Sequence, residues 1–99
     1  VAQAFYPEVR PAPEISPRAA IHPDVRLGAG CVVEEGAVIK KGAEIGEGTW
    51  IEANAVIGQN VRLGADCRIG ANAVISHALI GDHVRVYPGC CIGQDGFGF

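Results

Sequence analysis

A branched aliphatic residue returns at every sixth position through most of this 99-residue chain. The first run is unbroken: Ile15, Ile21, Leu27, Val33, Ile39, Ile45, Ile51, Ile57, Leu63, Ile69 and Ile75. One residue is then missing in the stretch ISHAL, and the period resumes at Ile80, Val86 and Ile92. Self-similarity at a short fixed period is typical of repeat architectures, in which each unit stacks on its neighbours.

Two further positions of the hexad have their own residue types. The fourth position is mostly glycine, asparagine, aspartate or histidine, as at Gly36, Asn54 and His83. These residues tolerate a positive φ best, so a corner is expected there. The fifth position is mostly small or β-branched. Because side chains alternate along a strand, the fifth position and the next aliphatic position should both point inward.

Each hexad is therefore expected to form a short strand and a corner. A helix does not fit, because six is not a multiple of 3.6 and glycine or asparagine in every hexad would weaken it. A hairpin meander would place its turns roughly 8–12 residues apart. The period predicts an all-β parallel solenoid with three short strands per 18-residue coil. Residues one coil apart should then stack about 4.8 Å from each other.

Residues 18 positions apart should form inward columns. The expected columns are Ala19, Ala37, Ala55 and Ala73; Ile21, Ile39, Ile57 and Ile75; and Cys31, Thr49 and Cys67. Cys31 and Cys67 are two coils apart, roughly 9–10 Å, whereas a disulfide needs about 4.4–6.8 Å between Cα atoms. We therefore interpret Cys31, Cys67 and Cys90 as small core residues and expect no disulfides.

One outward column contains only small apolar residues: Ala20, Val38, Val56, Val74 and Cys91. A continuous apolar strip is unusual on a solvated surface, so we interpret it as a subunit interface. One identical strip per chain suits a closed cyclic oligomer. The alternative interpretation is scattered surface valine. Another outward column carries Trp50 and Arg68 in successive coils, where a stacked cation–π pair is expected.

Composition and the ends of the chain narrow the possibilities further. Eight basic and 11 acidic side chains give a net charge of −3, which indicates neither a nucleic-acid nor a membrane surface. No apolar run approaches the roughly 18 residues that span a bilayer. Residues 1–14 contain three prolines and are expected to be an extended connector that follows another domain. Residues 15–99 are expected to form part of a β-helix of about four to five coils, with a loop exit at 93–99.

Several segments resemble a known family. The hexads IGEGTW, IGQNVR and IGANAV resemble those of the hexapeptide-repeat acyltransferases. The segments FYPEVRPAPEISPRAAIHPDVRLG (5–28) and ISHALIGDHVRVYPGCCIGQDGFGF (75–99) look like the UDP-3-O-(3-hydroxyacyl)glucosamine N-acyltransferases of lipid A synthesis. The GQDGFGF ending is the most specific part of this resemblance. It implies a left-handed parallel β-helix, usually assembled as a homotrimer.

The same resemblance implies an activity. These enzymes move a 3-hydroxyacyl group from acyl carrier protein to the 2-amine of a UDP-sugar, without a cofactor, in the cytoplasm of Gram-negative bacteria. Their general base is a histidine in later coils, beyond the DGFGF segment. No residue of this chain is therefore assigned to catalysis. We expect the chain to be an internal part of a longer enzyme and to be inactive by itself.

The candidate substrate-binding residues are Gln94, Asp95, Phe97 and Phe99. They would line a sugar or acyl pocket at the subunit boundary. In the alternative interpretation, the glycines of this segment allow a tight exit from the coil and the two rings plug it. The sequence is not that of a phosphate-binding loop, because no lysine, serine or threonine follows the glycines.

Two other classes of function remain open. The chain could belong to another β-helix enzyme, either a UDP-N-acetylglucosamine O-acyltransferase or a zinc carbonic anhydrase, which shares three histidines across a subunit boundary. This chain has three histidines: His22, His77 and His83. His22 and His77 are expected roughly 14–15 Å apart, too far to share a zinc ion unless another subunit intervenes. We instead expect a corner at His83, an irregular turn at His77 and no metal. The third class is a non-catalytic β-helix scaffold.

Overall fold

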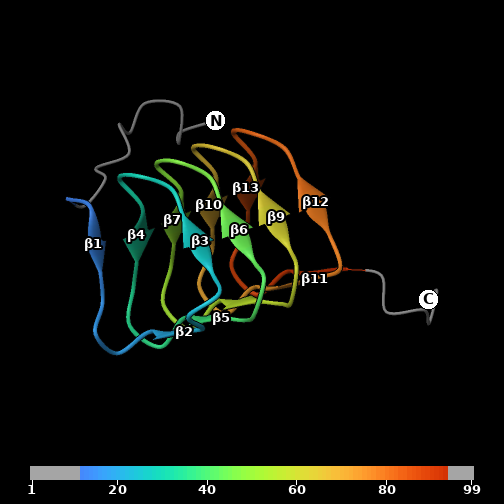
Figure 1. The fold of residues 1–99 in the computed structure, drawn as a ribbon. Coiled ribbons are helices and arrows are strands. Elements are labelled where there is room, and N and C mark those ends of the chain that lie inside the picture. The colour runs from blue at the N-terminus through green and yellow to red at the C-terminus, as the bar shows by residue number, and fades with distance from the viewer. Residues whose placement is uncertain (1–11, 94–99) are drawn as a thin grey trace, which may run out of the picture.

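The computed structural model describes residues 12–93, which form a three-sided parallel β-solenoid without any helix (Figure 1). Fourteen short strands follow one another around a triangular cross-section. Every third strand joins the same sheet, so each coil contributes one strand to each of three sheets. The all-β solenoid that the six-residue period predicts is thus confirmed.

The three sheets are named A, B and C. Sheet A contains β1 (Glu14–Ile15), β4 (Val32–Val33), β7 (Trp50–Ile51), β10 (Arg68–Ile69) and β13 (Arg85–Val86). Sheet B contains β2 (Ala20–Ile21), β5 (Val38–Ile39), β8 (Val56–Ile57), β11 (Val74–Ser76) and β14 (Cys91–Gly93). Sheet C contains β3 (Arg26–Leu27), β6 (Glu44–Ile45), β9 (Arg62–Leu63) and β12 (Leu79–Ile80).

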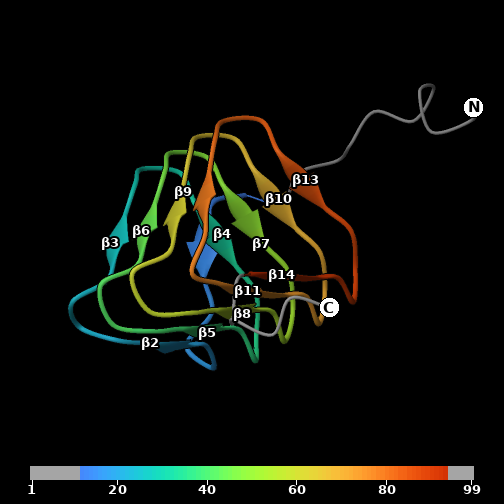
Figure 2. The ribbon, with the colours of Figure 1, turned by 90° about the vertical axis from the view of Figure 1, so that its right-hand side faces the viewer.

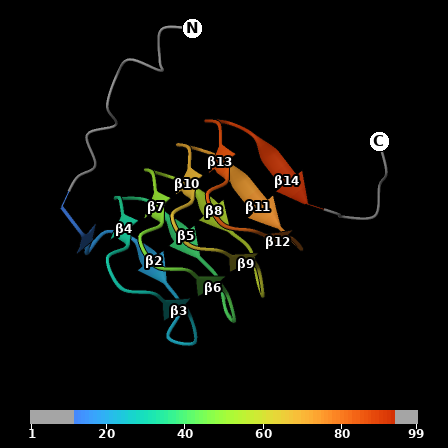
Figure 3. The same cartoon turned by 90° about the horizontal axis from the view of Figure 1, so that it is seen from above.

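The strand register follows the repeat. All neighbouring strands are parallel, and Val38 pairs with Val56, which pairs in turn with Val74. These partners are 18 residues apart. Beyond the shortened hexad the offset falls to 17, and Val74 pairs with Cys91. Figure 3 shows the strands of sheet B in this succession along the stack.

The coil is left-handed, as the family resemblance implied. Figure 2 looks along the stack from the end that carries β14. The chain rises on the side of β3, β6 and β9, descends on the side of β7, β10 and β13, and crosses the base through β14. It therefore turns clockwise while it approaches the viewer. Crossovers between parallel strands are usually right-handed, so the period alone would not have indicated this hand.

Left-handed backbone marks the corners. Positive φ occurs at most of the expected fourth positions: Gly30, Gly36, Gly42, Gly48, Asn54, Asn60, Asp66, Asn72, His83 and Gly89. Arg18 and Asp24 lack it, so the expected corner conformation is wrong at these two corners of the first coil. At the shortened hexad, His77 has a φ of 51° in place of Ala78, whose position in the repeat shifts into the core. The irregular turn expected at His77 is confirmed.

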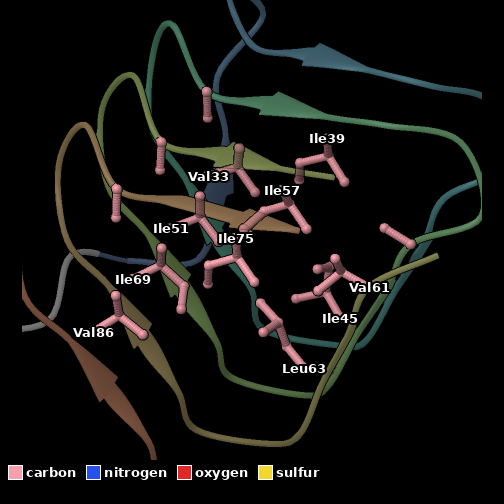
Figure 4. Close-up of a cluster of buried hydrophobic side chains, with 14 of the residues drawn as sticks. Val33, Ile39, Ile45, Ile51, Ile57, Val61, Leu63, Ile69, Ile75 and Val86 are labelled. Carbon is pink, nitrogen blue, oxygen red and sulfur yellow. The ribbon is translucent and has the colours of Figure 1, made fainter. Parts of the chain in front are cut away.

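The inward columns form the core (Figure 4). Ile57 and Ile75 are fully buried, as are Ala55 and Ala73 in the neighbouring column. Ala19 and Ile21 of the first coil are only partly buried, and they pack against this cluster from one side. The predicted columns are thus confirmed, and burial of branched aliphatic side chains on all three sheets supplies the main stabilising term.

The third inward column carries polar atoms that find partners in the backbone. The Cys31 thiol donates to the carbonyl of Gly46 at 3.2 Å, and the Thr49 hydroxyl donates to the carbonyl of Gly64 at 2.9 Å. Cys31 and Cys67 are buried free thiols, as expected. Cys90 is also a free thiol, but it is exposed, so its placement in the core is wrong. It lies in the last described coil, where no described strand stacks beyond it.

Replacing Thr49 with valine should lower the free energy of unfolding by about 1–3 kcal/mol. The buried hydroxyl also accepts from the Cys67 amide at 3.3 Å, so valine removes both a donor and an acceptor from a dry site. Thr49→Cys is the control, since it restores the thiol donor found in neighbouring coils. Denaturant titration should show a smaller loss for Thr49→Cys than for valine. Equal losses would mean that shape, and not hydrogen bonding, dominates here.

Candidate functional site

The predicted substrate-binding residues cannot be placed. Gln94, Asp95, Phe97 and Phe99 all lie outside the described residues. Their role therefore stays a prediction. The described part of the chain offers four other features that could bind a ligand or a partner. They are the histidines, the outer surface of sheet A, the apolar strip of sheet B, and a groove at the edge of sheet B.

The three histidines lie in three separate turns of the solenoid. His22 follows β2, His77 follows β11, and His83 precedes β13; all three are exposed. The Nδ1 atom of His22 accepts a hydrogen bond from the Asp24 amide at 3.0 Å. His83 lies 3.9 Å from the Asp66 carboxylate. Within residues 12–93, no three histidine, cysteine, aspartate or glutamate side chains come together as a metal site.

The outer surface of sheet A carries a network of charged and aromatic side chains. The Trp50 indole donates to Glu34 at 2.7 Å, and the Arg68 guanidinium lies 4.0 Å from the centre of the Trp50 ring. The expected cation–π pair is therefore confirmed. Arg68 also forms an ion pair with Glu52, a contact in which both side chains are largely shielded from water. Partial burial makes such a pair stronger than an exposed one, because water screens it less.

The network repeats once per coil. Glu34 accepts a second hydrogen bond from the Ala53 amide, and Glu52 accepts one from the Ala71 amide, each at 3.2 Å. Each carboxylate thus binds one side chain and one backbone N–H of the next coil. The first effect of this network is structural, since it ties three successive coils together along sheet A.

In the next coil, Gly70 takes the position of Glu34 and Glu52. Pro88 takes the position of Ala53 and Ala71. Glycine supplies no carboxylate, and proline supplies no amide N–H, so donor and acceptor disappear together. A small hollow of about 190 Å³ lies here, beside Arg85 and Tyr87. A side chain at Gly70 could not fill it, because a Cβ there would lie 2.4 Å from the Pro88 nitrogen.

The apolar strip on sheet B keeps its register along the stack. Ala20, Val38, Val56, Val74 and Cys91 are strand partners in successive coils. Val38 and Val56 are partly exposed, and Val74 is 37% exposed. The corresponding column of sheet C is charged in three of its four described coils, at Arg26, Glu44 and Arg62, and ends at Leu79; Glu44 and Arg62 lie 3.7 Å apart. An apolar strip beside a charged face is the contrast expected between an interface and a solvated surface.

Sequence reasoning missed a groove at the edge of sheet B, where the chain turns toward sheet C. It measures about 510 Å³ and is lined by Ala20, Ile21, His22, Val38, Ile39, Lys40, Lys41 and Gln59. The Lys40–Lys41 pair could have indicated it, because both lysines of the chain stand next to each other in the sequence. His22 and Lys40 are one coil apart, and so are Lys41 and Gln59. The four side chains therefore place hydrogen-bond donors at one corner of the stack.

Comparison with known proteins gives the class to which this fold corresponds. Residues 42–77 match the bacterial transferase hexapeptide (six repeats) family. The match covers about a third of the chain, and the fold of residues 12–93 is the parallel β-solenoid that such a six-residue repeat forms. None of the described residues forms a helix that is long and apolar enough to cross a membrane.

Particular relatives are UDP-3-O-acylglucosamine N-acyltransferases. The protein from Granulibacter bethesdensis is 72% identical over 25 residues, which make up 25% of this chain and 7% of that protein. A UDP-3-O-acylglucosamine N-acyltransferase 2 from Legionella pneumophila strain Lens is 74% identical over 23 residues, 23% of this chain and 7% of the relative. The resemblance to this enzyme family is thus confirmed over a stretch that spans a small part of the relatives.

One solved structure is similar over a longer part of the chain. It is a mutant GDP-perosamine N-acetyltransferase from Caulobacter crescentus, in complex with CoA and GDP-perosamine. The sequences are 28% identical, and the match covers 81% of this chain and 42% of the other, with a TM-score of 0.43.

Proposed function

We propose that this chain is part of an N-acyltransferase that moves a 3-hydroxyacyl group from acyl carrier protein to the 2-amine of UDP-3-O-acylglucosamine. The observation that carries the proposal is the identity of 72% with a UDP-3-O-acylglucosamine N-acyltransferase over 25 residues. The hexapeptide repeat at residues 42–77 supports acyl transfer as the wider class. The enzyme would act in the bacterial cytoplasm as part of lipid A synthesis.

The reaction needs an amine nucleophile, a thioester donor and a general base. The sugar amine attacks the thioester carbonyl of the donor, a C–N bond forms, and the C–S bond breaks. A general base takes the proton from the nitrogen, and the thiol of the carrier leaves protonated. We assign none of His22, His77 and His83 to the base. His77 and His83 instead serve as corner residues, since both have a positive φ.

In this proposal the described solenoid is a scaffold and an assembly surface. The rigid stack holds the apolar strip in a straight line, and the strip would join identical copies into a homotrimer. Gln94, Asp95, Phe97 and Phe99 would line the sugar or acyl pocket at the boundary between copies. Burial of acyl methylenes against the two rings would be worth about 0.8 kcal/mol per CH₂.

The decisive experiment is an acyl-transfer assay on the full-length protein that contains this chain. 3-Hydroxyacyl carrier protein is the donor, and UDP-3-O-acylglucosamine and UDP-N-acetylglucosamine are offered separately as acceptors. We expect N-acylation of the first and no transfer to the second. Transfer to the hydroxyl of UDP-N-acetylglucosamine would instead identify an O-acyltransferase. Absence of transfer to either acceptor would leave the proposal without support.

Replacing Val56 with lysine should dissociate the oligomer. The substitution places a charge in the middle of the strip, where an identical strip would have to bury it. The control is Leu79→Lys, which adds the same charge at a side chain that is 79% exposed on sheet C. Sedimentation or light scattering should give monomers for Val56→Lys and intact oligomers for Leu79→Lys. An intact Val56→Lys assembly would show that the strip is not the interface.

A further inference from the structure

We propose that the groove at the edge of sheet B, where the first three coils turn toward sheet C, binds a small organic molecule that carries a phosphate or diphosphate. The groove volume of about 510 Å³ suits such a ligand, since pockets for small molecules measure roughly 300–1,000 Å³. The proposal does not depend on acyl transfer, because the polar residues of the groove, His22, Lys40, Lys41 and Gln59, have no role in the proposed function.

The charge of the groove is the first argument. Lys40 and Lys41 both line it, and no acidic side chain does. On other faces, Arg18 lies beside Glu35 and Arg62 lies beside Glu44. Neither lysine forms an ion pair with a residue in the range 12–93. Two neighbouring ammonium groups repel each other, and a bound anion would relieve this repulsion.

The hydrogen-bond donors are the second argument. His22 accepts the Asp24 amide hydrogen at Nδ1, so this geometry leaves the ring proton on Nε2. The repeat stacks His22 below Lys40, and Lys41 below Gln59, at the coil spacing of about 4.8 Å. Donors from successive coils can therefore reach several oxygens of one ligand. Phosphate oxygens are strong acceptors for such charge-assisted hydrogen bonds.

The apolar floor is the third argument, and it selects an organic phosphate over the inorganic ion. Ala20 and Val38 line the groove beside the cationic corner, together with Ile21 and Ile39. A carbon skeleton attached to the phosphate would cover this floor. Ala20 and Val38 also belong to the apolar strip, so a neighbouring copy on the strip would form one wall of the groove.

Isothermal titration calorimetry at low ionic strength tests the proposal on the full-length protein. The probes are phenyl phosphate, which has an apolar ring, and inorganic phosphate. We expect saturable binding of both, with phenyl phosphate tighter by about fivefold. The double variant Lys40→Gln/Lys41→Gln should weaken phenyl phosphate at least about tenfold. Equal affinity for the two probes, or absence of saturable binding, would overturn the proposal.

The control is Arg26→Gln/Arg62→Gln, which removes two positive charges from sheet C and should change the affinity less than about twofold. Equal weakening by both double variants would mean non-specific attraction and would overturn the site. Sedimentation with phosphatidylglycerol vesicles distinguishes a lipid source. Vesicle binding without phenyl phosphate binding would contradict the proposal. So would loss of oligomers in the lysine variant, because the groove would then hold an acidic neighbour.

Discussion

Replacing Gly46 with alanine should lower the free energy of unfolding by about 3 kcal/mol, the upper end of ordinary overpacking costs. A Cβ at Gly46 would lie 2.4 Å from the carbonyl carbon of Gly64 and 2.6 Å from the nitrogen of Ala65. These atoms are backbone of the next coil. They cannot move away without breaking the hydrogen bond from the Gly46 amide to Leu63, which holds the two coils together.

Gly81 provides a matched control in the same column of the repeat. A Cβ there would meet nothing within 4 Å. Gly81→Ala should therefore change stability by less than about 0.5 kcal/mol. For a domain of this size, a loss of 3 kcal/mol corresponds to a melting temperature lower by roughly 12–24 °C. Equal melting temperatures for the two variants would show that the coils can separate locally, against the close approach described here.

The fold could be predicted from the sequence because every coil solves the same packing problem. The aliphatic residue at each sixth position defines the strands, and glycine or asparagine at the fourth position defines the corners. Errors arose where the repetition fails. Asp24, in the first coil, lacks the positive φ expected of it. Cys90 follows the inward pattern, but no described coil covers it. The left-handed coil could be predicted only from the family resemblance, since a coil of either hand satisfies the same six-residue period.

The candidate sites were harder to predict, because their contacts join residues that the hexad pattern treats as ordinary outward positions. The Trp50–Arg68 pair could be expected, since both lie in one column. The carboxylates of Glu34 and Glu52 reach sideways to the amides of Ala53 and Ala71, which a column diagram does not show. The cationic groove likewise depends on side chains from two columns that meet only at a corner.

Replacing Ile57 with alanine should cost about 2–5 kcal/mol of unfolding free energy. The side chain is fully buried in β8, between Ile39 and Ile75 of the coils on either side. Alanine would leave a cavity that these neighbours cannot close, because the parallel ladders of all three sheets fix the coil spacing. Ile57→Val removes a single methylene and should cost about 0.5–1.5 kcal/mol.

Ile15→Ala separates this cavity effect from a general effect of removing isoleucine. Ile15 belongs to the same aliphatic position of the repeat, but it is 47% exposed. Its loss should therefore cost less than Ile57→Ala, since part of the side chain is already in water. Denaturant titration of the three variants should rank Ile57→Ala as the most damaging. A loss for Ile15→Ala as large as that for Ile57→Ala would mean that the first coil is buried against something outside the described solenoid.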